Sequence, residues 1–199
     1  MKPILAMTPL LFCLAACSPE PAAAPDRVPD PANESAAAPP PAPAPSPPPP
    51  VEAPPAVNVL TLDGLGALRI GQAVPADSGW AERGAQISDL CRTVSSSAFP
   101  GVYAIVEGGK VRRITVGQRS DVRLVEGIGV GAAEAEVRAA FAGFREAPHE
   151  YVDAPAKYLT APNAPSGDPA LRFEIGENGK VSLIHVGTMP VLGYVEGCA

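Results

Sequence analysis

The chain has 199 residues and a formal net charge of −6, and from residue 58 onward it carries 13 lysines and arginines against 16 acidic residues. This mild acidity supports solubility and leaves no basic stripe of the kind that tracks a phosphate backbone. The charge therefore argues against nucleic acid as a partner.

The first 16 residues have the composition of a secretory signal. Lys2 gives a charged start, and an apolar run follows from Ile4 to Leu14. This run is about half of the roughly 20 residues that a membrane-spanning helix needs. The four residues that end at Cys17, Leu-Ala-Ala-Cys, resemble the lipobox of bacterial lipoproteins, which implies cleavage before Cys17 and a lipid on its sulfur. An ordinary cleaved signal is the alternative.

Residues 17–57 are expected to form a lipidated cysteine followed by a tether. Several acyl chains on Cys17 would hold the protein on a membrane, and Ser18 in the next position implies sorting to the outer membrane, with either face possible. Residues 18–57 hold 16 of the 26 prolines, with alanine filling most of the rest. Such a segment is an extended spacer that reaches about 120 Å at most. A proline-rich ligand for an aromatic groove is the alternative.

The rest of the chain, 58–199, is expected to form one globular unit from two tandem repeats, 58–118 and 119–199. In the first repeat we expect strands over 57–62, 67–70 and 90–94 and a short helix over 75–82. In the second we expect a strand over 122–128, a helix over 132–144 and strands over 157–160 and 191–196.

A duplicated hairpin is the strongest pattern in the sequence. Residues 103–117 reappear as 173–187, with eight of 15 positions identical and no gap. Gly108-Gly109 and Asn178-Gly179 are two-residue centres that favour primed turns. Pairing across these turns places on one sheet face Tyr103, Ile105, Ile114 and Val116, matched by Phe173, Ile175, Ile184 and Val186. The opposite face would carry Val111, Arg113 and Thr115, matched by Val181, Leu183 and His185, and would be either half-covered or a docking surface.

The second repeat contains the clearest helix and an insertion. Val137, Phe141 and Phe144 fall on one face of the helix over 132–144, while Glu134 and Arg138 form an i, i+4 pair outside. About ten extra residues separate this helix from its hairpin, and they fall in the loop 161–169. The loop is either a binding loop or a passive insertion.

The cysteines predict one disulfide. Cys13 leaves with the signal and Cys17 carries lipid, so Cys91 and Cys198 remain as one pair in an oxidising compartment. On the chain-entropy model such a bridge stabilises the fold by about 4 kcal/mol and holds the C-terminal segment in place. Neither cysteine lies in a C-x-x-C arrangement, which favours a structural bridge over a redox pair.

A search for catalytic or metal chemistry returns little. His149, Glu150 and Asp153 invite comparison with the H-E-x-x-H zinc motif, but the second histidine of that motif is missing. Zinc sites need three or four convergent ligands, so we expect no metal. Nothing in the chain predicts a cofactor.

A family resemblance rests on the strand-to-helix entries of the two repeats. Ile70-Gly71-Gln72 and the longer run from Ile128 to Val137, Ile-Gly-Val-Gly-Ala-Ala-Glu-Ala-Glu-Val, resemble the SmpA/OmlA (BamE-like) envelope lipoproteins. Two such units in tandem are similar to the β-lactamase-inhibitor-protein fold. The resemblance implies helices packed on one face of an antiparallel sheet, and a role in binding proteins without catalysis.

These observations predict an α+β fold of two tandem repeats, each a helix packed on an antiparallel sheet built around a β-hairpin. The expected function is a non-catalytic binding module in the cell envelope, with an envelope protein as partner and the lipid anchor in the membrane. The candidate binding surface comprises Arg113, Thr115, Leu183, His185, Tyr194, Asn163 and Asp168. Two alternatives are an envelope hydrolase that uses His149, Glu150 and Asp153, and a small-ligand carrier, which predicts an apolar pocket between helix and sheet.

Overall fold

The structure, a computed structural model, describes residues 58–86 and 88–198. The predicted signal (1–16), the lipidation at Cys17 and the tether to residue 57 lie outside the described residues. Within these residues the fold is mixed α+β, as predicted, and consists mostly of antiparallel sheet with one α-helix. None of the helices described there is long and apolar enough to cross a bilayer.

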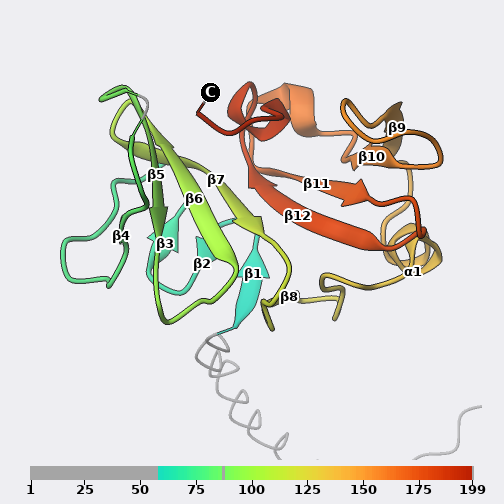
Figure 1. Cartoon of the computed structure of the whole chain (residues 1–199), viewed down its shortest axis with the longest axis horizontal. Helices are drawn as coiled ribbons and strands as arrows, with labels where there is room; N and C mark the ends of the chain where they lie inside the picture. The colour runs from blue at the N-terminus through green and yellow to red at the C-terminus, as the bar shows by residue number, and fades with distance from the viewer. Residues whose placement is uncertain (1–57, 87, 199) are drawn as a thin grey trace, which may run out of the picture. The chain divides into compact units, whose positions relative to one another are not determined.

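An eight-stranded antiparallel sheet is the centre of the fold (Figure 1). Its order is β4-β5-β6-β7-β12-β11-β10-β9. The strands are β4 (Ala81–Glu82), β5 (Cys91–Ser95), β6 (Val102–Glu107), β7 (Lys110–Val116), β9 (Arg145–Pro148), β10 (Lys157–Thr160), β11 (Ala170–Ile175) and β12 (Val181–Gly187). The two predicted hairpins, β6–β7 and β11–β12, are therefore neighbours in the middle of one sheet.

A second, four-stranded sheet covers part of one face. It contains β1 (Val59–Thr61), β2 (Gly64–Leu65), β3 (Leu68–Arg69) and β8 (Arg123–Leu124), in the order β3-β2-β1-β8. β1 and β8 are parallel, so this sheet joins the start of the described chain to the beginning of its second half. Leu60, Leu65 and Leu124 from this sheet are buried in the main core cluster.

The helix α1 (Glu134–Ala140) adds the other cover. Val137 is fully buried, and Phe141 and Phe144, just after the helix, lie 5.7 Å from the ring of Phe173 in β11. The predicted apolar face of this segment is thus confirmed, although the helix is shorter than 132–144. The predicted pair is also confirmed, with Arg138 Nη2 2.6 Å from Glu134 Oε1.

The two hairpins meet at β7 and β12, where Thr115 pairs with His185. These residues are 70 positions apart, which is the offset of the sequence repeat. Each hairpin also carries a bulge at the same place, where the register shifts by one residue and leaves Arg112 in β7 and Ser182 in β12 without a partner in the pairing. Gly187 allows the close approach at this junction, because a Cβ there would lie 2.2 Å from the Arg112 carbonyl oxygen.

The turns of the hairpins differ by one residue. Gly108 and Gly109 both have positive φ, as the predicted primed turn requires. In the second hairpin only Gly179 does, and a hydrogen bond from Gly176 N–H to Lys180 O closes a longer loop. The prediction of a two-residue primed turn at Asn178-Gly179 was therefore wrong, since this loop contains one residue more.

The shifted registers separate the two equivalent aromatic residues. In the second hairpin the longer loop compensates for the bulge, so Phe173 pairs with Ile184 and faces the core, as predicted. In the first hairpin nothing compensates, and Tyr103 pairs with Thr115 while Ile105 pairs with Arg113. Tyr103 and Ile105 therefore lie on the opposite face from Ile114 and Val116, which corrects the predicted grouping, because a one-residue shift reverses every side chain.

Three further predictions fail. Val111 and Val181, expected opposite the core, belong to the main core cluster. Residues 75–80 form turns and lead into β4 without any helix, because Gly79 has a positive φ of 73°. Residues 191–196 contain a short 3-10 helix, η2 (Val191–Gly193), where a closing strand was expected.

Candidate functional site

The C-terminal segment covers the face of the large sheet that lies opposite the core. We call residues 188–198 the C-terminal strap and the sheet surface beneath it the strap face. In Figure 1 the strap ends between the two halves of the sheet. It begins at Thr188, whose N–H donates to Arg112 O (3.0 Å), and it contains η2 and the disulfide at Cys198.

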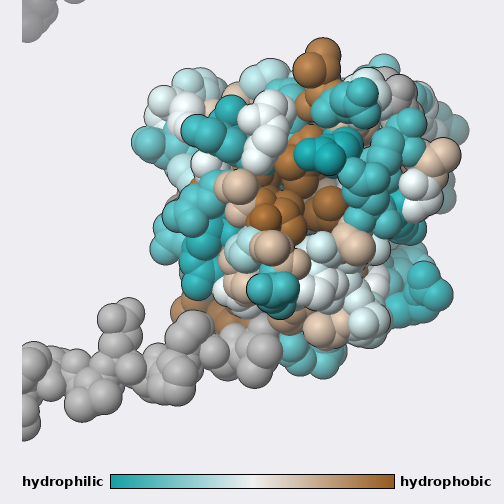
Figure 2. Space-filling view, turned by 90° about the vertical axis from the view of Figure 1, so that its left-hand side faces the viewer, coloured by the Kyte–Doolittle hydropathy of each residue, from teal (hydrophilic) through white to brown (hydrophobic). Residues whose placement is uncertain are grey.

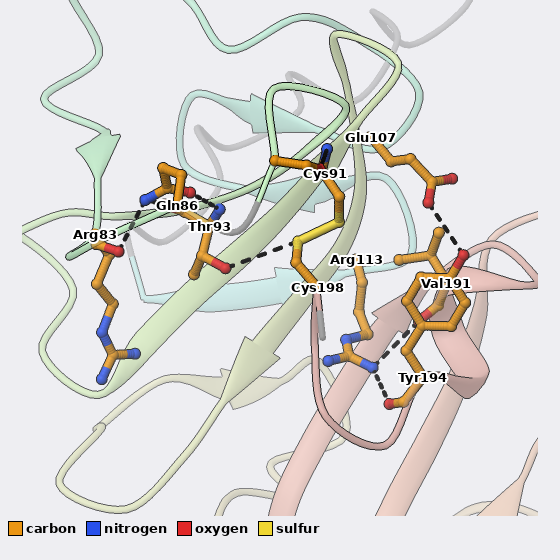
Figure 3. Close-up of a disulfide and its surroundings, with 10 residues drawn as sticks. Arg83, Gln86, Cys91, Thr93, Glu107, Arg113, Val191, Tyr194 and Cys198 are labelled. Atoms are coloured by element: carbon orange, nitrogen blue, oxygen red, sulfur yellow. Dashed lines mark hydrogen bonds between the residues drawn. A yellow bond between two sulfur atoms is a disulfide. The ribbon is translucent and has the colours of Figure 1, made fainter.

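Arg113 holds the strap from below. Its side chain is 1% exposed, and its Nη1 donates to the carbonyl oxygens of Val191 (3.2 Å) and Tyr194 (2.5 Å) (Figure 3). Burial lowers the pKa of the Arg113 guanidinium below its usual value. Arg172 contributes a similar bond from Nη1 to Gly193 O (3.3 Å). Two arginines thus bind three carbonyl groups of the strap.

A chain of hydroxyl, imidazole and carboxylate groups lies beside Arg113. Thr115 Oγ1 is 2.9 Å from His185 Nδ1, and His185 Nε2 is 3.0 Å from Glu174 Oε1. With a neutral imidazole, the hydroxyl donates to Nδ1, and Nε2 carries the hydrogen that Glu174 accepts. Burial lowers the pKa of His185, although the hydrogen bond to Glu174 acts in the opposite direction.

His149 reaches the same carboxylate from the other end of the sheet. Its Nε2 lies 3.3 Å from Glu174 Oε2, and its Nδ1 accepts from the backbone N–H of Tyr151 (3.2 Å). Its ring stacks on Tyr158, with 4.6 Å between the centroids. Burial raises the pKa of Glu174, but the hydrogen bonds from His185 and then His149 reverse this and bring it below its ordinary value.

The order of groups in this chain resembles a nucleophile, base and acid, but its position prevents catalysis in this conformation. Thr115 is fully buried and His185 is 2% exposed. No substrate atom can reach the hydroxyl while the strap is in place, and a nucleophile must contact the bond that it attacks. This row of hydrogen-bonded side chains therefore has a structural role, because each group provides a partner for a polar neighbour that would otherwise be buried without one.

The prediction of an open docking surface on the strap face was wrong. Arg113, Thr115 and His185 were expected on an open sheet face and are instead buried under the chain's own C-terminal segment. Leu183 is half-buried on the same face, opposite Glu174. Tyr194 belongs to the strap itself, and its hydroxyl donates to Glu107 Oε1 (3.0 Å), which raises the pKa of Tyr194.

The predicted disulfide between Cys91 and Cys198 is present. The two Cα atoms are 5.6 Å apart, across 107 positions of sequence, and the bridge joins the strap to the first residue of β5. Next to it, Gln86 pairs with the backbone of Thr93: the Thr93 N–H donates to Oε1 (2.7 Å) and Nε2 donates to Thr93 O (3.4 Å) (Figure 3). This side chain protects the β5 edge beyond the two residues of β4.

The three residues predicted for a hydrolase, His149, Glu150 and Asp153, do not converge on one site. His149 turns toward Glu174, while Glu150 and Asp153 are exposed. A hollow of about 660 Å³ beside His149 is also lined by Asp153 and Lys157. Across residues 58–86 and 88–198 no group of three or more metal-ligating side chains converges.

The loop 161–169 behaves differently, because its first residues line an open apolar pocket. The pocket has a volume of about 340 Å³ and lies between the small sheet, the end of α1 and the β10–β11 connection. Asn163 is on its wall, whereas Asp168 is not and instead accepts from Ser166 Oγ (3.0 Å). The lining residues are Leu60, Thr61, Leu62, Leu124, Val125, Glu126, Phe141, Phe144, Ala161, Pro162, Asn163 and Leu171.

Apolar side chains at the rim of this pocket project into solvent. Val125 is 72% exposed and Leu62 is 45% exposed, while Leu60 and Leu171 at the base are buried. The volume is within the lower range of pockets that take small ligands or single side chains. We call this feature, with the lining residues given above, the rim pocket.

A second apolar area lies on another side of the molecule. Figure 2, which views the side of β4 and β5, shows a central strip of apolar residues bordered by hydrophilic ones. In the first half of the described chain, Trp80 stacks on Phe99 with 5.7 Å between the ring centroids, and both are more than nine-tenths buried. These side chains are therefore packed against one another and are not free to bind a ligand.

Sequence reasoning found one wall of the rim pocket and missed the rest. Asn163 was predicted, and Phe141 and Phe144 were assigned to the core that they indeed contact. Val125 gave no signal, because it falls within the strand predicted over 122–128, whereas the structure has only the two-residue β8 followed by a turn over 125–127. Glu174 and Arg172 were also missed, although they alternate with the apolar residues of β11 and so indicate a polar face.

Comparisons with known proteins do not extend this description: no protein-family model, curated protein or solved structure matches the chain.

Proposed function

We propose that this protein is a non-catalytic binding module of the bacterial cell envelope, which recognises an apolar group of a partner protein in the rim pocket. In this proposal a lipid on Cys17 anchors the chain in the outer membrane, and residues 18–57 act as its tether. The observation that carries the proposal is the rim pocket itself, where Leu62 and Val125 project beside an apolar hollow. Exposed apolar side chains that surround a cavity are typical of binding sites.

The polar groups support a role without catalysis. Thr115 and His185 are buried and bonded to each other, and Arg113 is buried with its Nη1 bonded to carbonyl oxygens of the strap. Of the two recognition regions predicted from the sequence, the strap face is thus occupied, and only the loop that begins at Ala161 adjoins an open site. The resemblance to the BamE-like lipoproteins, in which binding replaces catalysis, agrees with this reading.

The domain is, in this proposal, a tandem duplication. Three observations support it: the eight identical positions, the pairing of Thr115 with His185 at the repeat offset, and the bulges at Arg112 and Ser182. The halves have since diverged, because only the second contains α1. The rim pocket accordingly occurs beside the half that retains a helix.

Site-specific photo-crosslinking in intact cells tests the function. We expect a benzoylphenylalanine at Pro162 to capture one envelope protein, and the same group at Asn178, in the second hairpin turn, to capture none. The Pro162 capture should disappear with Leu62→Asn, which removes a rim side chain. It should persist with Leu90→Asn, a matched change at a leucine that is 77% exposed outside the pocket.

Two outcomes would reject the proposal. The first is capture that survives Leu62→Asn, because the partner then does not use the rim pocket. The second is capture of lipid alone at Pro162, which would favour the small-ligand carrier. That alternative has a specific observation in its favour, since it predicts an apolar pocket between helix and sheet and the rim pocket has this location.

A further inference from the structure

The charges around the rim pocket restrict the partner that it can take. Nine of its 12 lining residues are apolar, and the remaining three are Thr61, Glu126 and Asn163. The only charged group on the lining is therefore a carboxylate, and no lysine or arginine lines the pocket. A ligand that carries an anionic head would meet repulsion at the mouth and find no cation there to compensate.

The other two polar groups of the lining are already engaged. Thr61 Oγ1 donates to Gly64 O (3.3 Å), and Asn163 Nδ2 donates to Pro169 O (3.3 Å). Glu126 is exposed, and no hydrogen bond or ion pair to it is found within the described part of the chain. Other exposed carboxylates near cations are paired, as Glu146 is with Arg138 and Lys157. Arg123 Nη1 lies nearby, on the carbonyl oxygen of Gly127 (3.1 Å), but it forms no ion pair with Glu126, so this carboxylate remains available to a cation from outside.

The exposed side chains of the rim favour a protein partner over a small ligand. A molecule that filled only the 340 Å³ hollow would leave most of Val125 in water, since this side chain is 72% exposed. A partner surface that inserts one side chain and rests on the rim would also cover Val125 and Leu62. Burial of such a rim around an inserted side chain is the common arrangement of a protein interface.

We propose that the rim pocket binds a segment of a partner protein in which an aliphatic or aromatic side chain stands beside a lysine or arginine. The apolar side chain enters the hollow against Phe144 and Leu171, and the cation pairs with Glu126. This inference rests on the proposed function and specifies the chemistry of its partner.

The test compares three labelled peptides that differ only in charge. They are acetyl-Leu-Phe-Lys-Lys-amide, the Gln-Gln version and the Glu-Glu version. Their binding to the full chain, held by its lipid in phosphatidylcholine nanodiscs, is measured by fluorescence polarisation, with empty discs as the blank. We expect the basic peptide to bind about tenfold more tightly than the acidic one at low salt, and this ratio to fall in 1 M NaCl.

Matched variants locate the effect. Glu126→Gln should reduce the ratio between basic and acidic peptides to about one, while Glu177→Gln, at an exposed glutamate of the second hairpin loop, should leave it unchanged. Leu62→Asn should weaken all three peptides together. All three substitutions are at exposed positions, so the fold is expected to tolerate them.

Equal binding of the three peptides, or a preference for the acidic one, would overturn the inference. The proposed function would survive that result if the crosslink at Pro162 still depended on Leu62. Binding of the basic peptide that is unaffected by Glu126→Gln would also overturn the inference, because the cation would then be held elsewhere.

Discussion

The two central hairpins share eight of 15 positions, yet their equivalent side chains face different parts of the molecule. In the second, Phe173 is fully buried against Phe141 and Phe144. In the first, the matching Tyr103 lies on the strap face, half-buried, with Arg83 above its ring at 5.5 Å. The cause is one additional loop residue, which cancels the bulge in the second hairpin alone. The number of residues in the turn, more than the identity of the side chain, thus determines which face of the sheet each aromatic residue occupies.

The two hairpins also contribute different residues to the two faces of the large sheet. The first hairpin contributes Arg113 and Thr115 to the strap face, and the second contributes Glu174 and His185. Each hairpin supplies one side of a polar layer that neither completes alone. The core face of the second hairpin, by contrast, supports the aromatic residues behind the rim pocket. One face therefore holds the strap and the other holds the candidate site.

The largest test of this comparison is truncation of the two equivalent aromatics. Phe173→Ala should destabilise the domain by about 4 kcal/mol, because it leaves a cavity in the core, while Tyr103→Ala should cost about 1 kcal/mol. Urea unfolding of the two variants beside the unchanged chain measures both. Similar losses of stability in the two variants would contradict the assignment of Phe173 and Tyr103 to opposite faces of the sheet.

A smaller loss of stability is expected when a strap-face residue of the first hairpin is replaced by its counterpart in the second. The position that corresponds to Arg113 is Leu183. Arg113→Leu removes two bonds to strap carbonyls and should cost about 2 kcal/mol. Hydrogen exchange should show faster exchange at the strap amides, while the amides of β11 and β12 keep their protection. Lys110→Leu, at an exposed position, is the control, and unchanged strap exchange in Arg113→Leu would contradict the assigned role.

The smallest effect concerns pH. The folded pKa of His185 is lowered, so the unfolded chain binds a proton first as the pH falls below about 6.5. Glu174, whose folded pKa is also lowered, acts in the same direction nearer its ordinary value. Stability should therefore be fully present above about pH 6.5 and decline toward pH 5. The groups that face His185 here are Glu174, Arg113 and Arg172.

The variant that isolates this effect is His185→Gln, which keeps a polar group between Thr115 and Glu174 but does not titrate. Urea unfolding at pH 7.0 and pH 5.0 should show a smaller difference for this variant than for the unchanged chain. An equal difference would mean that other groups account for the acid sensitivity.

Much of the fold follows from local pattern, and the failures have identifiable causes. The hairpins, the strand over 157–160, the Glu134–Arg138 pair and the disulfide depend on short-range periodicity or on the cysteine count, and all are present. The bulges are not predictable in this way, because Arg112 and Ser182 have nothing in common that marks an unpaired residue. The strap was read as a strand from its apolar residues, but Pro190 and Gly193 favour a turn.

The candidate site was the least accessible to sequence reasoning. The rim pocket draws its walls from five segments between Leu60 and Leu171, and no local pattern brings these together. The expected docking face failed for the opposite reason: its alternation was correct for Arg113, Thr115 and His185, but a distant segment covers it. Alternation indicates which side chains share a face and does not indicate what packs on it.

The long separation between Cys91 and Cys198 has a consequence for biosynthesis. Because the two cysteines are 107 positions apart in the sequence, the thiol of Cys91 leaves the ribosome well before its partner has been made. During that interval Arg113 and its neighbours have no lid, and the unpaired sulfur is open to reaction with other thiols. The disulfide, and with it the attachment of the strap to β5, can therefore form only after the C-terminal end of the chain has been synthesised.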